Sequence, residues 1–166
     1  KVYQMIAKGD TVGVFQLESR AQMATLTRLQ PTRFYDLVVS IALIRPGPIG
    51  GKMVHPYLRR RRGQEEITYP DPCLQPILER NLGIPIFQEQ VMRIAMVAAD
   101  FSGQEADNLR QAMGFRRFQA EFPDLAERLQ QGMTRNKIPP SAQKEIIDFI
   151  TAFAAYGFPE SHSASF

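Results

Sequence analysis

The stretch GIPIFQEQVMRIAMVAADFSGQEADNLRQAMGFRR, residues 83–117, decides the fold that we predict for this chain. Apolar residues recur in its first half at i, i+3 and i+4, which predicts a buried helical face. Ser102 then precedes Glu105 by three residues, a capping-box pattern that predicts a second helix from Gly103 to about Gly114. The stretch therefore predicts two helices joined by a short turn, with an apolar set made of Ile86, Phe87, Val91, Met92, Ile94, Ala95 and Ala98.

The second helix of this pair should carry a polar ridge. Asp107, Arg110 and Gln111 are spaced three and four residues apart, so they share one helical face. Arg116 and Arg117 follow at the end of the stretch. These residue types predict an accessible cationic surface, but they do not identify a substrate.

The rest of the chain is also patterned for helices. We expect them at residues 2–8, 18–29, 33–44, 57–62, 74–81, 123–133 and 141–156, with Thr32 and Ser141 as N-caps. RPGPIGG at residues 45–51 should be a shaped turn outside regular structure, and Pro56 should interrupt a helix. The prediction is an all-α, compact, irregular multi-helix domain of about eight helices, with at most one short strand pair near residues 67–72.

Length and charge set broad limits on the function. The 166 residues fit one domain, 1–166, which we expect to be an excised piece of a longer chain. The net charge is +3, from 20 basic and 17 acidic residues, so the positions of the cations matter more than their total. No apolar run approaches the roughly 18 residues of a membrane span, so we expect no membrane partner.

The chemistry-bearing residues are sparse. Cys73 is the one cysteine, which excludes an internal disulfide and makes a reducing cytoplasm the expected location. The two histidines, His55 and His162, stand apart, so no Cys/His metal cluster is predicted. The acidic residues are scattered and form no pair that could hold two metal ions. We therefore predict no catalytic residue and no metal site in this chain.

The densest charge is the run Arg59, Arg60, Arg61 and Arg62. One interpretation is a solvated helix end, where the cations offset the helix dipole and Glu65 and Glu66 partly neutralise them. The other is phosphate contact, because the planar guanidinium fork matches phosphate oxygens. The sequence leaves both open.

Several ordered segments resemble motifs of the bacterial C-family DNA polymerase, the DNA polymerase III alpha subunit family. They cover nearly the whole chain, and they resemble the error-prone branch more than the main replicase. The segments are GVFQLES (13–19), RPGP (45–48), FQEQVM (87–92), ADNLRQAMG (106–114) and YGFPESHSASF (156–166).

The resemblance implies a fingers domain, a helical lobe that follows the palm. The palm carries the aspartates that bind magnesium, and these lie outside this chain. The parent would be a DNA-directed DNA polymerase that acts in replication or lesion-bypass repair synthesis. Its partners would be primer–template DNA, deoxynucleoside triphosphates and its own palm, and the isolated chain should be inactive.

The resemblance also implies site residues. The nucleotide-binding candidates are Arg110, Gln111, Tyr156 and His162. Many family members have a second arginine where this chain has Gln111, which keeps a donor but loses the charge. The DNA-binding candidates are the cations Arg45, Lys52, Arg59, Arg60, Arg61, Arg62, Arg116 and Arg117.

Each candidate has a structural alternative. Arg110 can form an i, i+3 salt bridge with Asp107 instead of meeting a triphosphate. Tyr156 can be a core residue, Arg45 a turn residue that caps a helix, and His162 a capping or hydrogen-bonded histidine. For the whole chain the alternatives are a helical packing module without nucleotide contact and a stand-alone helical DNA-binding domain.

Overall fold

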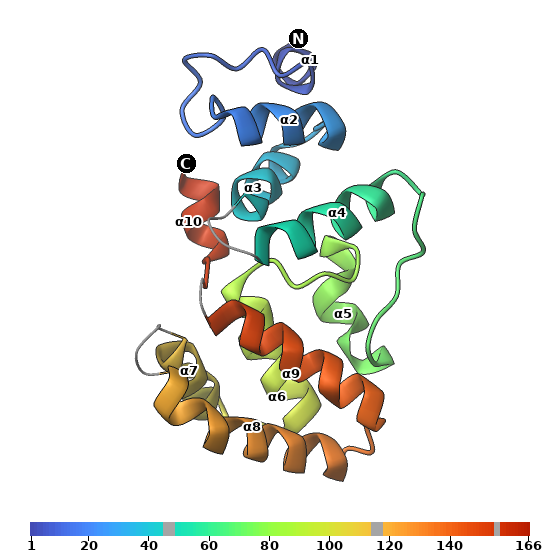
Figure 1. The fold of residues 1–166 in the computed structure, drawn as a ribbon, viewed down its shortest axis with the longest axis vertical. Coiled ribbons are helices and arrows are strands. Elements are labelled where there is room, and N and C mark those ends of the chain that lie inside the picture. Colours follow the sequence, from blue (N-terminus) through green and yellow to red (C-terminus); the bar gives the residue numbers. More distant parts are fainter. Residues whose placement is uncertain (45–48, 114–117, 155–156) are drawn as a thin grey trace. The chain divides into compact units, whose positions relative to one another are not determined.

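The computed structural model describes residues 1–44, 49–113, 118–154 and 157–166, without the side chains of 49–53, 118–121 and 154 (Figure 1). All regular structure in this described part is helical, which confirms the all-α prediction. The helices are α1 (Val2–Ala7), α2 (Arg20–Leu29), α3 (Phe34–Leu43), α4 (Ile49–Arg61), α5 (Gln75–Leu78), α6 (Gln88–Ala99), α7 (Gly103–Ala112), α8 (Phe118–Arg135), α9 (Pro140–Ala154) and α10 (Glu160–Ser165), with 3₁₀ turns η1 (Pro72–Leu74) and η2 (Glu79–Asn81).

The chain divides into two compact units. Unit 1 comprises Lys1–Glu66 and Phe158–Phe166, and unit 2 comprises Ile67–Gly157. Unit 1 is thus built from both ends of the described chain. No helix in the described residues is both long and apolar enough to span a membrane.

Unit 1 holds α1 to α4 and α10. Ile6, Leu17 and Leu26 form a buried cluster that joins α1, the following loop and α2. At the other end of the chain, Ser163 of α10 is 1% exposed, and its Oγ donates a hydrogen bond to the Val38 carbonyl of α3 at 2.5 Å. This contact holds α10 on α3.

Asp36, not Thr32, completes the start of α3. The Asp36 carboxylate accepts the backbone N–H groups of Thr32 at 2.9 Å and Arg33 at 3.2 Å. The N-cap is Arg33, so the prediction that Thr32 caps this helix is wrong. An acid in the first turn satisfies the same orphan donors from inside the helix and also suits the helix dipole.

Three further predictions about unit 1 are wrong. Helix α4 begins at Ile49 and continues through Pro56. Residues 49–51 are therefore helical, and Pro56 does not interrupt the helix. Tyr57 and Leu58 directly after the proline are each 2% exposed, and their burial offsets the loss of one backbone donor. Helix α2 starts at Arg20 after the N-cap Ser19, so Glu18 lies in the preceding loop.

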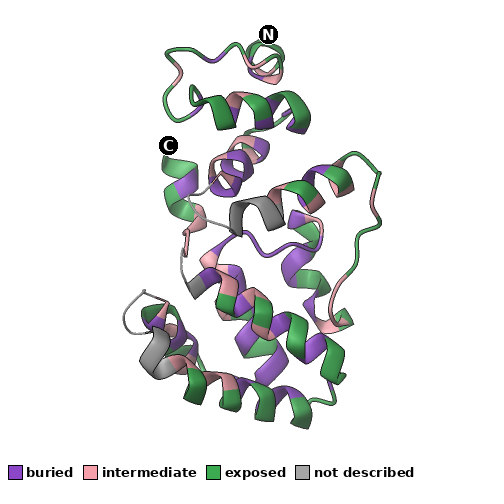
Figure 2. Cartoon of the chain, in the orientation of Figure 1, coloured by how far each residue is buried: buried purple, intermediate pink, exposed green. Residues whose placement is uncertain are grey.

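Unit 2 is organised around α6. Helix α6 packs against α7, α8 and α9, and Figure 2 shows buried residues along α6, with exposed residues on the outer sides of α8 and α9. The predicted apolar set is buried except for Met92, which is half-buried. The predicted capping box is also confirmed: Ser102 and Glu105 bond each other's backbone N–H at the start of α7.

The FQEQ motif has a structural role through Gln90. Its Oε1 accepts the N–H groups of Ile86 at 2.8 Å and Phe87 at 3.0 Å, while Nε2 donates to the Ile77 carbonyl and to Asn81 Oδ1 at 3.1 Å each. Gln90 is 8% exposed. One buried amide therefore ties the start of α6 to α5 and η2.

Candidate nucleotide and DNA contacts

The predicted polar ridge of α7 exists, and Asp107 organises it. Asp107 Oδ1 accepts a hydrogen bond from Arg110 Nε at 2.7 Å, and Oδ2 accepts one from Gln111 Nε2 at 2.6 Å. The two bonds hold the pKa of Asp107 below its usual value, with the Arg110 bond as the larger cause. The carboxylate therefore stays ionised and fixes both neighbouring side chains.

Arg110 is both a salt-bridge partner and an accessible cation. The i, i+3 pair with Asp107 confirms the contact named by the structural alternative. The Arg110 side chain nevertheless remains 41% exposed, so it is not buried beneath a neighbouring helix. The salt bridge engages Nε, and the structure records no other partner of the Arg110 terminal nitrogens among the described residues. Those nitrogens can bind an anion.

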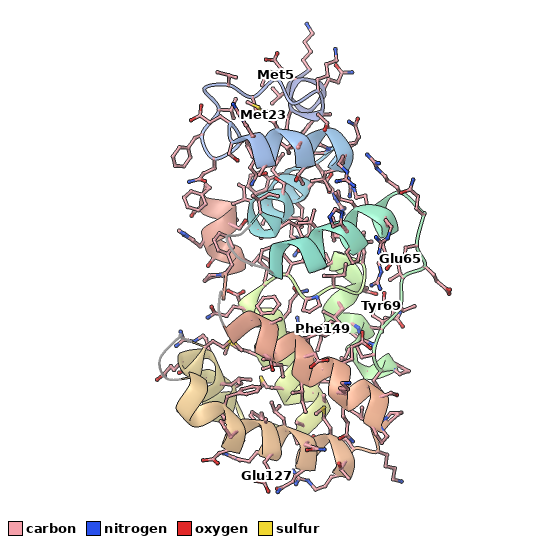
Figure 3. The ribbon with its side chains drawn as sticks, viewed as in Figure 1. Met5, Met23, Glu65, Tyr69, Glu127 and Phe149 are labelled. Carbon is pink, nitrogen blue, oxygen red and sulfur yellow. The ribbon has the colours of Figure 1, made fainter. Side chains whose placement is uncertain are left out.

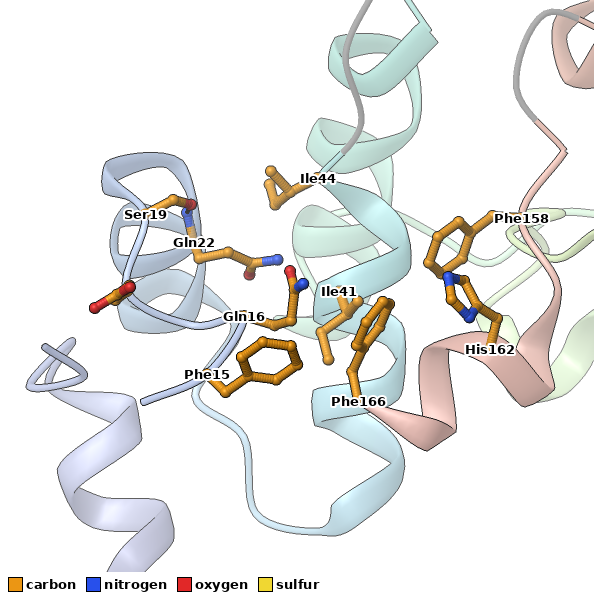
Figure 4. A pocket seen from close by; sticks show the side chains of 10 residues that line it. Phe15, Gln16, Ser19, Gln22, Ile41, Ile44, Phe158, His162 and Phe166 are labelled. Atoms are coloured by element: carbon orange, nitrogen blue, oxygen red, sulfur yellow. Dashed lines mark hydrogen bonds between the residues drawn. The ribbon is translucent and has the colours of Figure 1, made fainter. Parts of the chain in front are cut away.

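His162 lies in unit 1, in a row of aromatic rings along α10. Its ring centroid is 5.4 Å from that of Phe158 and 4.5 Å from that of Phe166. The three residues are spaced four apart in the sequence, and the two centroid distances place their rings next to one another. His162 also lines a cavity of about 510 Å³, shown in Figure 4. The sequence contained this spacing, but the site prediction used only the histidine.

The loop between α1 and α2 forms the facing wall of this cavity. The cavity is lined on this side by Phe15, Gln16, Ser19 and Gln22 (Figure 4). Ile41 of α3 and Ile44, which directly follows α3, also line it. Gln16 adopts a positive φ of 62°, a conformation that favours glycine. Thr11 Oγ1 donates to the Leu17 carbonyl at 2.7 Å, and the Gly13 N–H donates to Glu18 at 3.0 Å. Sequence reasoning missed these wall residues, although Phe15, Gln16 and Ser19 belong to the GVFQLES motif.

The arginine run is bonded within unit 1. Glu65, labelled in Figure 3, accepts Arg59 Nε at 2.7 Å and Arg60 Nε at 2.9 Å. These two hydrogen bonds hold the pKa of Glu65 below its usual value, the Arg59 bond being the larger cause. The partial neutralisation by Glu65 was expected from the sequence.

Arg61 and Arg62 donate hydrogen bonds to backbone carbonyls at the end of α2. Arg61 Nε donates to the Leu29 carbonyl at 3.3 Å, and Arg62 Nε donates to the Arg28 carbonyl at 3.0 Å, both in the last turn of α2. A terminal nitrogen of Arg61 also lies 2.7 Å from the Asp36 carboxylate. The run therefore acts as an internal clamp, and DNA contact by these arginines stays a prediction.

The remaining candidates lie beyond what the structure describes. Arg45, Arg116, Arg117 and Tyr156 are outside the described residues, as is the side chain of Lys52 within α4. Among the described residues, no group of three or more His, Cys, Asp or Glu side chains could hold a metal ion. A pair of palm-type magnesium ions therefore has no fitting donor set in this described part.

Comparison with known proteins gives a consistent result. Residues 1–137 match the model of the bacterial DNA polymerase III alpha subunit finger domain. The chain is 57% identical to an error-prone DNA polymerase of Corynebacterium jeikeium over 100% of its length, and 56% identical to those of Pseudomonas fluorescens and Vibrio campbellii over 99%.

The chain spans only a small part of these relatives, 14% of the Corynebacterium protein and 16% of the other two. The matched model, however, covers most of the chain, in the region that contains the α7 ridge and the wall loop of the cavity. From these matches we conclude that the chain belongs to the finger-domain family of the bacterial DNA polymerase III alpha subunit.

Proposed function

We propose that this chain is the finger domain of a DNA-directed DNA polymerase of the error-prone type. It would position the incoming deoxynucleoside triphosphate and contact primer–template DNA during replication or lesion-bypass synthesis. The metal-binding aspartates of the reaction would belong to the palm, outside this chain. The family match and the names of the relatives support this proposal.

The observation that carries the nucleotide role is the fixed but accessible guanidinium of Arg110. Helix α7 starts at a capping box and buries Ala106, Leu109 and Ala112, so the direction of its exposed face is set by packing. Asp107 then orients Arg110 through Nε. A guanidinium held in this way binds phosphate oxygens with little loss of side-chain entropy, and it stays charged at any working pH.

Gln111 would add a neutral donor. Gln111 is tied to the same carboxylate as Arg110, so it can donate to a phosphate oxygen without adding charge. Arg110 would therefore carry most of the electrostatic recognition of the triphosphate by the described residues.

The test uses the full-length polymerase that carries this finger domain. Arg110→Ala should lower kcat/KM for the incoming nucleotide roughly 10- to 100-fold and leave primer–template affinity almost unchanged. Arg93→Ala is the matched control, because Arg93 is an exposed arginine of α6 in the same unit. Gln111→Arg should strengthen nucleotide binding by restoring a second cation.

Two outcomes would contradict the nucleotide role. If Arg110→Ala and Arg93→Ala have equal nucleotide kinetics, Arg110 serves only as a helical partner of Asp107. If Arg110→Ala lowers the melting temperature and leaves kcat/KM intact, the packing-module alternative is correct.

A further inference from the structure

We propose that the cavity of unit 1 between residues 15–22 and α10 binds an unpaired nucleobase of single-stranded DNA. The proposal rests on the proposed function only in taking DNA as the ligand. It assigns a strand-binding role to Phe15, Gln16 and Gln22, which is separate from triphosphate recognition by Arg110. The cavity has a volume of about 510 Å³, enough for a base and its sugar.

Aromatic rings supply the stacking surface. The Phe15 and Phe166 centroids are 5.7 Å apart, and the His162 ring lies 4.5 Å from that of Phe166. Phe15 is 68% exposed and Phe166 is 40% exposed, although exposed phenylalanine is costly in water. Planar rings that remain open to solvent on a DNA-binding domain are the usual platform for unstacked bases.

Two glutamine amides supply hydrogen-bonding groups. Gln22 is 5% exposed, and its Nε2 is held by the Ser40 carbonyl at 3.1 Å. Its Oε1 is buried and has no hydrogen-bond partner among the described residues. A buried acceptor without a donor destabilises the folded chain. The amino group of a base would supply that donor.

Gln16 is the side chain that would move to admit the base. Figure 4 shows the amide ends of Gln16 and Gln22 directed toward the same part of the cavity. Since Gln22 Oε1 is shielded from solvent, a neighbouring side chain has to rotate before a base can reach it. The backbone of Gln16 is fixed by the loop bonds around it, so this rotation leaves Phe15 in place.

The charges around the cavity favour a strand base over a free triphosphate. Among the described residues that line the cavity there is no lysine or arginine, and one of them is Glu18. A deoxynucleoside triphosphate brings about four negative charges that need cations nearby. A base within a strand brings only one phosphate per nucleotide, and that phosphate can remain outside the cavity. The charges of the lining residues therefore favour binding of a base over binding of a phosphate group.

The test compares two oligonucleotides that differ only in their bases. A single-stranded oligonucleotide of about 12 nucleotides and an abasic strand of the same length are titrated against the chain. Phe15→Ala should weaken binding of the normal strand about 5- to 100-fold and leave binding of the abasic strand unchanged. Phe34→Ala is the matched control, since Phe34 is 59% exposed in the same unit but does not line the cavity.

A local probe comes from the histidines. The chain has two, so its proton NMR spectrum has two Hε1 signals, which a His55→Gln variant assigns. The normal strand should shift the His162 signal and not the His55 signal, while the abasic strand should shift neither. A deoxynucleoside triphosphate alone should leave the His162 signal unchanged.

Each other outcome overturns the proposal. If both strands bind equally and Phe15→Ala changes neither affinity, the cavity is not a base site. That result would still be consistent with phosphate contact and with the proposed function. A His162 shift by the triphosphate alone would assign the cavity to the nucleotide instead. Failure to bind either strand would count against both the base site and DNA contact by this domain, while the Arg110 kinetics would still test triphosphate recognition.

Discussion

Gly132 of α8 lies so close to Ala99 of α6 that a Cβ added at position 132 would be 2.3 Å from the Ala99 carbonyl oxygen. The same Cβ would lie 2.7 Å from the Ala99 Cα. Both neighbours are backbone atoms, which cannot rotate away as a side chain can. Helices α6 and α8 can therefore keep this approach only with glycine at position 132.

Gly132→Ala should destabilise the chain by about 2–3 kcal/mol, because α8 has to move away from α6 and uncover part of its buried face. Urea unfolding followed by circular dichroism measures the loss. Gly103→Ala is the control, since a Cβ there meets nothing within 4 Å. The control should be neutral or stabilising by up to about 1 kcal/mol. Equal stability of the two variants would show that the close approach does not exist in solution.

Arg61 should matter more for stability than its neighbour Arg59. The Arg61 side chain is 22% exposed and pairs with Asp36, whose side chain is 1% exposed. Arg61→Ala leaves that carboxylate buried with fewer donors, and we expect a loss of about 2–4 kcal/mol in unfolding free energy. Arg59 is 51% exposed, so Arg59→Ala should have little effect. Thermal unfolding of both variants decides this, and equal losses would disprove the clamp.

Asp36 should make the chain sensitive to acid. Burial alone would raise the pKa of Asp36, but the Thr32 N–H and the Arg61 guanidinium outweigh burial and hold the pKa below the ordinary 3.8. A lowered folded pKa contributes stability above the unfolded pKa, and this contribution is lost as the pH falls through the folded pKa. Asp36→Asn should therefore flatten the pH dependence of unfolding free energy below about pH 4. Parallel curves for both proteins would rule this out.

Binding of the isolated chain to duplex DNA should be weak and should depend on salt. The arginine run is mostly engaged by Glu65, Asp36 and the carbonyls of α2, so these four arginines have little capacity left for phosphate contact. We expect dissociation constants of roughly 10⁻⁴ to 10⁻⁶ M without sequence preference, rising with salt concentration. Fluorescence anisotropy at two salt concentrations is the measurement. Salt-independent binding would contradict phosphate contact.

The sequence predicted features whose cause is local. The Ser102–Glu105 capping box and the shared face of Asp107, Arg110 and Gln111 follow from spacings of three and four residues. Such spacings fix geometry within one helix turn.

The predictions from the sequence were wrong where residues distant in the chain determine the local structure. Helix α4 continues through Pro56 because Tyr57 and Leu58 are buried by other elements, and burial cannot be derived from the local pattern. The partner of Arg61 lies 25 residues away in the chain, so no motif could identify it. The cavity beside His162 likewise joins segments from opposite ends of the sequence.

The hydrogen bond between Ser163 and Val38 joins residues 125 positions apart. During synthesis, α3 leaves the ribosome long before α10. The part of α3 around Val38 therefore stays uncovered until α10 has been made. The continuous segment Ile67–Gly157 can fold in that interval, because none of its residues depends on a later part of the described chain for its own unit. Unit 1 is therefore completed last, and until then its incomplete apolar surface is open to chaperones and to aggregation.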